Sequence, residues 1–421
     1  MPVILPAPPQ GPPPAPPNPF VSVGACVLVM AGAAGYALYT WPKNIPVGTL
    51  WFWMRVAGFP ALGCALLYGF RLLYFERQRE RLDAQTVQWK EDCAEATWFA
   101  QEPLALLGLG YLCAQGSFDV ARAMIDGDRP LESHIPAAGA QTVRHTRLSL
   151  IDDPLLVDRH ASCLRELLAM LDDAIRLIPE TVPFEVHLHC PGNIGAGELL
   201  AIWQTCWAQT SRRSVEASVL GRDEGVMALD AWLDGYGGPA LEKVALFVAV
   251  QLHDTPPVNS AEAAVALLLG WAPVIQRTGL PVPVLLHRPV EQLDGPLSDA
   301  LRTALLWGRA QAPDVEDVWQ TGLAPADIPA LLDAAAQVKL GASQTRGLPG
   351  FHDMDPATGH AGVADAWLAL ALAAEHAAST GKAQMVATRQ QAIRLAVVQP
   401  HHATNEQHEG NTMETSREGS A

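Results

Sequence analysis

The sequence predicts a duplicated α/β domain that is preceded by a two-helix membrane hairpin. Two long apolar stretches lie within residues 21–75, and strand-like and helix-like runs alternate from about residue 103. The alternation begins again near residue 291. Alternating strands and helices are typical of α/β domains with a buried, mainly parallel or mixed sheet. Because the pattern runs twice, it indicates an internal duplication.

Composition and charge limit the class of function. Of the 421 residues, 49% are hydrophobic and only 17% are charged, a mixture that indicates membrane segments beside a soluble body. The formal net charge of −16, with no clustered Lys and Arg patch, predicts no binding of nucleic acid. Seven scattered cysteines form no Cys-x-x-Cys pair, which fits reduced thiols in a cytoplasmic domain.

The N-terminal region predicts a leader and two membrane spans. Residues 1–20 are Pro-rich and are expected to be an extended, solvated leader. Residues 21–40 carry no charge and are about long enough to span the hydrocarbon of a bilayer. The second span, residues 50–74, has Trp and Arg side chains at its ends, as membrane interfaces favour. A cleaved signal peptide is the alternative for the first span, but the leader lacks basic residues.

Positive charge predicts the orientation of this hairpin at residues 21–75. The loop between the spans contains Lys43 as its one basic residue, whereas five basic residues lie at or after the end of the second span: Arg71, Arg77, Arg79, Arg81 and Lys90. Cytoplasmic flanks carry the excess of Lys and Arg. We therefore expect a multi-pass protein of the bacterial inner membrane, with both termini and the large domain in the cytoplasm. Residues 76–102 are expected to form a helical juxtamembrane stalk.

Patterning of apolar residues predicts the elements of the soluble body. The first half, 103–290, has strands at 104–116, 183–189, 216–220, 244–252 and 281–287, and helices at 118–126, 161–178, 197–209 and 227–233. The run 261–269 is a strand, with helix as the alternative because it is rich in Ala. The second half, 291–400, has helices at 297–306, 326–337 and 362–376, and strands at 315–320, 384–388 and 392–398. Residues 401–421 are polar and are expected to be a disordered tail.

The segment 218–232, named here the elbow, is a strand that turns through Gly221 into an amphipathic helix. Backbone N–H groups converge at such a bend, and many α/β enzymes mount a nucleophile there. This bend contains Arg222, Asp223 and Glu224, with no Cys, Ser or Thr. It is therefore either an emptied active site or an ordinary surface turn.

The order of elements resembles the thiolase fold, and specifically the β-ketoacyl synthases. Residues 107–116, with 121–130, resemble the family's opening strand, which ends in Gly-Leu-Gly and leads to a turn and a helix. Residues 225–229 resemble the helix that follows the family's nucleophilic Cys. Residues 245–250 and 260–269 resemble the next two strands, and residues 359–372 resemble the final Gly-His motif with its Ala-rich helix. The resemblance covers roughly 300 residues by order of elements.

The resemblance also implies which catalytic positions have changed. It places Arg222 where the family has its Cys, and Thr321 with Gly322 where the family's first catalytic His begins a His-Gly-Thr-Gly-Thr loop. Only His360 of the set is retained. Condensation needs a thiolate nucleophile and imidazole groups, which Arg and Thr cannot supply. The resemblance therefore implies a pseudoenzyme without a cofactor or a metal, and it implies the family's homodimer.

Other candidate residues have a chemical and a structural interpretation. Cys190 ends a strand before a glycine-rich loop and could be an activated thiol, with His189 or His360 as its base. His187 and His189 share a strand face, and His352 lies near Asp353 and Asp355, so either group could bind a metal. A buried thiol, satisfied histidines and a solvated loop are the simpler interpretations. The glycine-rich loop 192–197 lacks Lys-Ser/Thr and is no Walker loop.

The leading hypothesis is a membrane-anchored, catalytically inactive thiolase-like domain that binds protein partners at the cytoplasmic face of the inner membrane. Residues 21–75 would contact the lipid bilayer. Accessory proteins of type VI secretion are the context that this organisation most resembles, with a secretion effector or an apparatus component as partner. The alternative is a membrane-associated thioester or acyl-transfer enzyme that uses Cys190, and a third hypothesis is a structural membrane scaffold.

Overall fold

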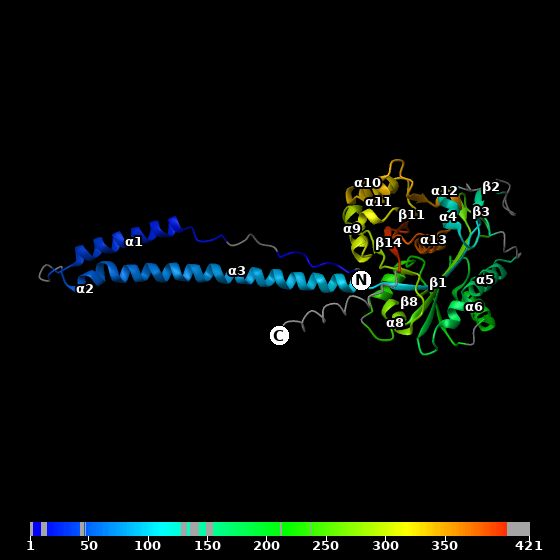
Figure 1. The fold of residues 1–421 in the computed structure, drawn as a ribbon, viewed down its shortest axis with the longest axis horizontal. Helices are drawn as coiled ribbons and strands as arrows, with labels where there is room; N and C mark the ends of the chain where they lie inside the picture. Colours follow the sequence, from blue (N-terminus) through cyan, green and yellow to red (C-terminus); the bar gives the residue numbers. More distant parts are fainter. Residues whose placement is uncertain are drawn as a thin grey trace, which may run out of the picture. The chain divides into compact units, whose positions relative to one another are not determined.

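The computed structural model describes residues 3–9, 15–42, 46, 48–127, 133–134, 143–148, 155–210, 213–235 and 237–401. The chain divides into two compact units, Ile4–Ala96 and the chain from Thr97 onward (Figure 1). Lys43, residues 128–130 of the predicted opening motif and the predicted tail from residue 402 lie outside the described residues.

The first unit contains the predicted hairpin. Helix α1 is Pro19–Thr40; α2 (Leu50–Trp53), a π-helical turn (Met54–Gly58) and α3 (Phe59–Ala100) follow as one helical stretch. Both stretches are long and apolar enough to cross a membrane. At about 1.5 Å per residue, the 51 residues from Leu50 to Ala100 extend about 75 Å, which exceeds the roughly 30 Å of hydrocarbon. The second span and the predicted stalk are therefore one helix.

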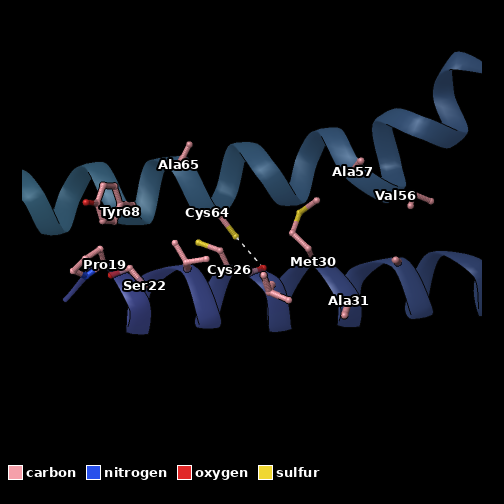
Figure 2. A pocket seen from close by; sticks show the side chains of 13 residues that line it. Pro19, Ser22, Cys26, Met30, Ala31, Val56, Ala57, Cys64, Ala65 and Tyr68 are labelled. Atoms are coloured by element: carbon pink, nitrogen blue, oxygen red, sulfur yellow. Dashed lines mark hydrogen bonds between the residues drawn. The ribbon is translucent and has the colours of Figure 1, made fainter. Parts of the chain in front are cut away.

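The two helices of the hairpin face each other across an apolar cavity of about 740 Å³. Figure 2 shows Cys26 and Met30 of α1 opposite Cys64 of α3, whose Sγ lies 4.0 Å from the carbonyl oxygen of Cys26. The leader lies along the stalk, because the carbonyl of Pro6 accepts a hydrogen bond from Nε1 of Trp89 at 2.9 Å. At this point the leader thus supplies the acceptor that a partly buried indole N–H needs.

The second unit is built on one mixed sheet of eleven strands. The first half contributes β1 (Leu104–Leu112), β4 (Phe184–His189), β5 (Glu216–Val219), β6 (Val244–Gln251) and β8 (Ala263–Trp271). The second half contributes β9 (Val284–Leu286), β10 (Val290–Glu291), β11 (Asp317–Thr321), β12 (Phe351–Asp353), β13 (Gln384–Arg389) and β14 (Ile393–Pro400). A small separate sheet contains β2 (Ser133–His134), β3 (Val143–Thr146) and β7 (Ser260–Ala261).

Sheet topology confirms the predicted duplication. The spatial order is β5-β4-β6-β8-β1 in the first half and β12-β11-β13-β14-β9 in the second. When the five strands of each half are numbered by their order in the chain, without β10, both halves have the same spatial order: third, second, fourth, fifth, first. Strand β10 is left out because it lies off this path and pairs with β14. The first two pairings in this order are parallel and the next two are antiparallel in each half. The two halves join where β1 and β9 pair antiparallel.

Helices cover the sheet in layers (Figure 1). Helices α5 (Leu156–Leu177), α6 (Ala196–Thr210) and α8 (Ala272–Thr278) form a core with one face of the first half. Helices α9 (Leu297–Trp307), α10 (Asp327–Val338) and α11 (Gly341–Gln344) do the same for the second half. A third core lies between the halves and contains α4 (Val120–Ile125), α7 (Met227–Leu233) and α13 (Asp365–Thr380). A short α12 (Asp355–Thr358) precedes α13.

Burial explains the composition of two helices. Trp203 and Trp207 of α6 stack on each other in the core at a centroid distance of 5.4 Å, as their helical spacing predicts. Helix α13 is apolar almost all round because it is buried between the two half-sheets. The Ala-rich run 261–269 is largely strand β8 rather than helix, since β1 and β6 pair with it on both sides.

Candidate functional site

A cavity of about 660 Å³ opens at the carboxyl ends of the sheet strands and takes residues from both halves. From the first half come Pro191 after β4, the bend of the elbow after β5, and the connection between β6 and β7. From the second half come the loop before α13 and the turn between β13 and β14. Ligands of α/β proteins commonly bind in this position relative to the strands.

A buried histidine at the end of β4 holds the backbone of the elbow. His189, at the end of β4, lies 3.3 Å from the carbonyl oxygen of Arg222 through Nε2. Nε1 of Trp367, which can only donate, lies 3.1 Å from Nδ1 of the same ring. Nδ1 therefore accepts, and Nε2 carries the proton that is donated to Arg222. Burial lowers the pKa of His189, so the neutral ring is favoured.

A buried arginine holds the same bend from the second half. Nη2 of Arg394, on β14, donates to the carbonyl of Asp223 at 3.0 Å, and Nη1 donates to the carbonyl of Glu224 at 3.2 Å. Its Nε donates to Glu291 at 2.9 Å. Gly225 has φ of +49°, and a Cβ there would lie 2.5 Å from Oε1 of Gln390, so glycine is required. The elbow is thus a fixed structure rather than a mobile surface turn.

Arg222 is exposed and lines the cavity from this bend. Residues 221–225 contain no thiol and no hydroxyl group. A guanidinium group therefore occupies the bend, and the fold brings that group to the cavity.

His360 lines the cavity from the loop before α13, in the second half of the domain, whereas the elbow belongs to the first half. Its Nδ1 contacts the buried carboxylate of Asp365, which also accepts from the N–H of Ala361. This contact raises the pKa of His360. Since Nδ1 faces Asp365, Nε2 is the nitrogen that is left to face a ligand.

Thr321 lies behind the cavity wall and not in its lining. Its Oγ1 donates to Asp355 at 2.8 Å, and the N–H of Gly322 donates to the same carboxylate at 3.0 Å. A Cβ on Gly322 would lie 3.4 Å from Cε1 of His360, so these two residues are close neighbours. The fold therefore brings Arg222, Thr321 and His360 to one region, but the hydroxyl of Thr321 is engaged by Asp355.

Cys190 adjoins the cavity through Pro191 but is not itself a lining residue. Burial raises the pKa of its thiol to about 12. A reactive cysteine needs the opposite shift, which neighbouring cations or helix N-termini provide. The environment of Cys190 opposes thiolate formation.

A second polar cluster, which local sequence patterns do not predict, contributes Gln251, His253 and Ser260 to the lining of the cavity. Oγ of Ser260 lies 2.8 Å from Nδ1 of His145 and donates to the carbonyl of Pro257 at 2.6 Å. Nε2 of Gln251 lies 3.2 Å from Nε2 of His253, and burial lowers the pKa of His253. The carbonyl of Pro257 therefore competes with the imidazole of His145 for the hydroxyl proton of Ser260, which weakens its use as a nucleophile.

The residues considered for a metal do not converge. Nδ1 of His187 lies 2.8 Å from Oγ of Ser218, and its ring stacks on Phe247. Nε2 of His352 pairs with Asp317 at 2.8 Å rather than with its neighbours in sequence. Among the described residues, no group of three or more His, Cys, Asp and Glu side chains could hold a metal ion.

Comparison with known proteins supports the fold. No protein-family model and no curated protein matches the chain. Ketosynthase twelve of the bacillaene polyketide synthase of Bacillus amyloliquefaciens is similar with a TM-score of 0.53, 11% identity and coverage of 72% of this chain and 74% of that chain. The ketosynthase from module 6 of the bacillaene synthase of Bacillus subtilis 168 is similar with a TM-score of 0.53 and 13% identity, over 72% of this chain and 72% of that chain. The ishigamide ketosynthase/chain length factor is similar with a TM-score of 0.50 and 15% identity, over 71% of this chain and 100% of that chain.

The second unit therefore has the thiolase-like fold of the ketosynthases. At these identities the likeness concerns the fold alone, and the chemistry has to be argued from the side chains of this chain.

Proposed function

We propose that this protein does not catalyse condensation and instead binds another protein at the cytoplasmic face of the bacterial inner membrane. One observation carries the proposal: Arg222 occupies the bend of an elbow whose backbone is still held by His189 and Arg394. A preserved frame without a nucleophile fits a site that is used for binding. The buried thiol of Cys190 and the engaged hydroxyl of Ser260 do not replace the missing group.

The hairpin supports the membrane part of the proposal. Two helices are long and apolar enough to cross, and the contact of Pro6 with Trp89 keeps the leader beside the stalk. Both ends of the hairpin would then lie on one side of the membrane. The basic residues Arg77, Arg79 and Arg81 of α3 favour the cytoplasmic side.

The proposed partner is defined by its class. A component or an effector of a contact-dependent export system, such as type VI secretion, is the partner that the resemblance of the sequence favours. A homodimer through the domain is compatible with this role, since two copies would present two cavities.

Proximity labelling tests orientation and partner binding in one experiment. A biotin ligase fused to either end of the full chain should label cytoplasmic proteins, because the ligase needs cytoplasmic ATP. The C-terminal fusion should enrich a specific set of proteins relative to a control that carries the ligase after residue 102. No labelling from a membrane-inserted fusion would contradict the orientation. Identical protein sets from the full chain and the control would contradict partner binding and favour a structural scaffold.

A further inference from the structure

The cavity at the elbow is lined mainly by groups that donate hydrogen bonds. Arg222 and Arg389 bring guanidinium groups, and His360 brings an imidazole with one nitrogen held by Asp365. Asn259, Gln390 and Gln391 add side-chain amides. Asp223 is the one carboxylate among the lining residues.

The two arginines are not equivalent. Nη1 of Arg389 contacts Asp327, so its charge is already balanced within the protein. Arg222 has no carboxylate partner among the ion pairs of the described residues, and its side chain is exposed to the cavity. Its position is nevertheless fixed, because His189 and Arg394 bind the three consecutive carbonyls of residues 222–224. A guanidinium on a rigid mount is suited to bidentate binding of a planar anion.

The rest of the lining indicates the size and shape of the ligand. Pro191, Pro257, Val258 and Val363 provide apolar surface beside the polar groups. A volume of about 660 Å³ accommodates more than a bare ion. A carboxylate attached to a small apolar body matches both parts of the surface.

We infer that this cavity binds a carboxylate, held by the guanidinium of Arg222 with Nε2 of the protonated His360 ring as the second donor, and that it does so without any covalent step. The carboxylate belongs either to a small free acid or to the C-terminus of a protein. The second source rests on the proposed function, whereas carboxylate binding itself does not.

Calorimetry with matched probes tests the inference on the full chain in mild detergent. The probes are N-acetyl-alanyl-leucine as the free acid, the same dipeptide as its C-terminal amide, and sodium acetate. The acid should bind about 10- to 100-fold more tightly than the amide, since a charge-assisted pair is lost in the amide. The substitution Arg222→Gln should weaken binding of the acid by a similar factor. Arg302→Gln, at an exposed arginine that pairs with Asp299, should leave it unchanged.

The outcomes separate the two sources and the failure of the inference. Acetate that binds within a few-fold of the dipeptide acid indicates a small free acid, and a preference of 10-fold or more for the dipeptide indicates a peptide terminus. Equal affinity for acid and amide, no measurable binding of any probe, or equal binding by the Arg222→Gln variant would overturn the inference. None of these results depends on whether proximity labelling finds a partner.

Discussion

Replacement of Glu262 by alanine is expected to lower the free energy of unfolding by about 3–5 kcal/mol. Glu262 is buried and accepts from Nη1 of Arg159 at 3.0 Å, from the N–H of Leu148 at 3.1 Å and from the N–H of His253 at 3.1 Å. It thereby joins α5 and two loops to the β7–β8 segment beside the cavity. Its removal leaves the charge of Arg159 buried with its main carboxylate partner gone, which is the costly case for an ion pair.

Denaturant unfolding of the full chain in mild detergent, followed by tryptophan emission, measures this effect. Glu242→Ala is the matched control, because Glu242 pairs with Arg277 at the surface at 3.2 Å. The control should cost less than about 1 kcal/mol. A loss in the Glu262 variant as small as that in the Glu242 variant would contradict the account of the buried pair.

Replacement of Arg288 by methionine is expected to have a similarly large effect. This fully buried guanidinium donates to Asp230 at 2.7 Å, to Asp234 at 2.6 Å and to the carbonyl of Leu233 at 2.7 Å, all on or next to α7. It also lies 5.1 Å from the ring centroid of Phe99 in the last turn of α3. Methionine keeps the volume but leaves the buried carboxylate of Asp230 without its cation, so a loss of about 3–5 kcal/mol is expected.

The loss in the Arg288 variant should depend on pH. Burial raises the pKa of Asp230, and Arg288 opposes that shift. Without Arg288 the folded-state pKa rises further above the unfolded value of about 3.9, so the folded protein holds a proton that the unfolded chain releases. Stability of the variant should therefore fall as pH rises through the folded-state pKa. Unfolding of both proteins at several values from about pH 4 upward should show a penalty that grows with rising pH and then levels off; a penalty that shrinks would contradict the role of Asp230.

The sequence was informative where a pattern is local. Apolar periodicity located the hairpin helices, α7 and α13, and it predicted the repetition that the matching strand orders confirm. It did not predict β12, which has only three residues and is an edge strand defined by its pairing with β11. The predicted mainly parallel or mixed sheet is confirmed as a mixed sheet, in which β8 and β14 each pair antiparallel on both sides.

Local sequence patterns likewise identify some residues of the site and miss others. Arg222 and His360 could be identified because each lies in a short segment with a recognisable shape, a strand-turn-helix bend and a Gly-His before an Ala-rich helix. Arg394 could not, because the carbonyls that it holds lie about 170 residues away in the chain. The sequence suggests a base or a metal ligand at His189, whereas its partner in the structure, Trp367, belongs to the other half. Local sequence patterns cannot predict that side chains from distant parts of the chain stabilise this bend.

The proposed function requires that the ketosynthase-like fold of this chain carries a binding site and not an acylated nucleophile. Incubation of the native full chain with a thiol-directed acyl probe and with a serine-directed fluorophosphonate, each followed by mass spectrometry, tests it directly. No specific labelling is expected, because burial raises the pKa of Cys190 to about 12 and the carbonyl of Pro257 competes with His145 for the hydroxyl proton of Ser260. Labelling of Cys190 or Ser260 that is stoichiometric in the native protein and lost on denaturation would contradict the claim and establish an acyl-transfer enzyme.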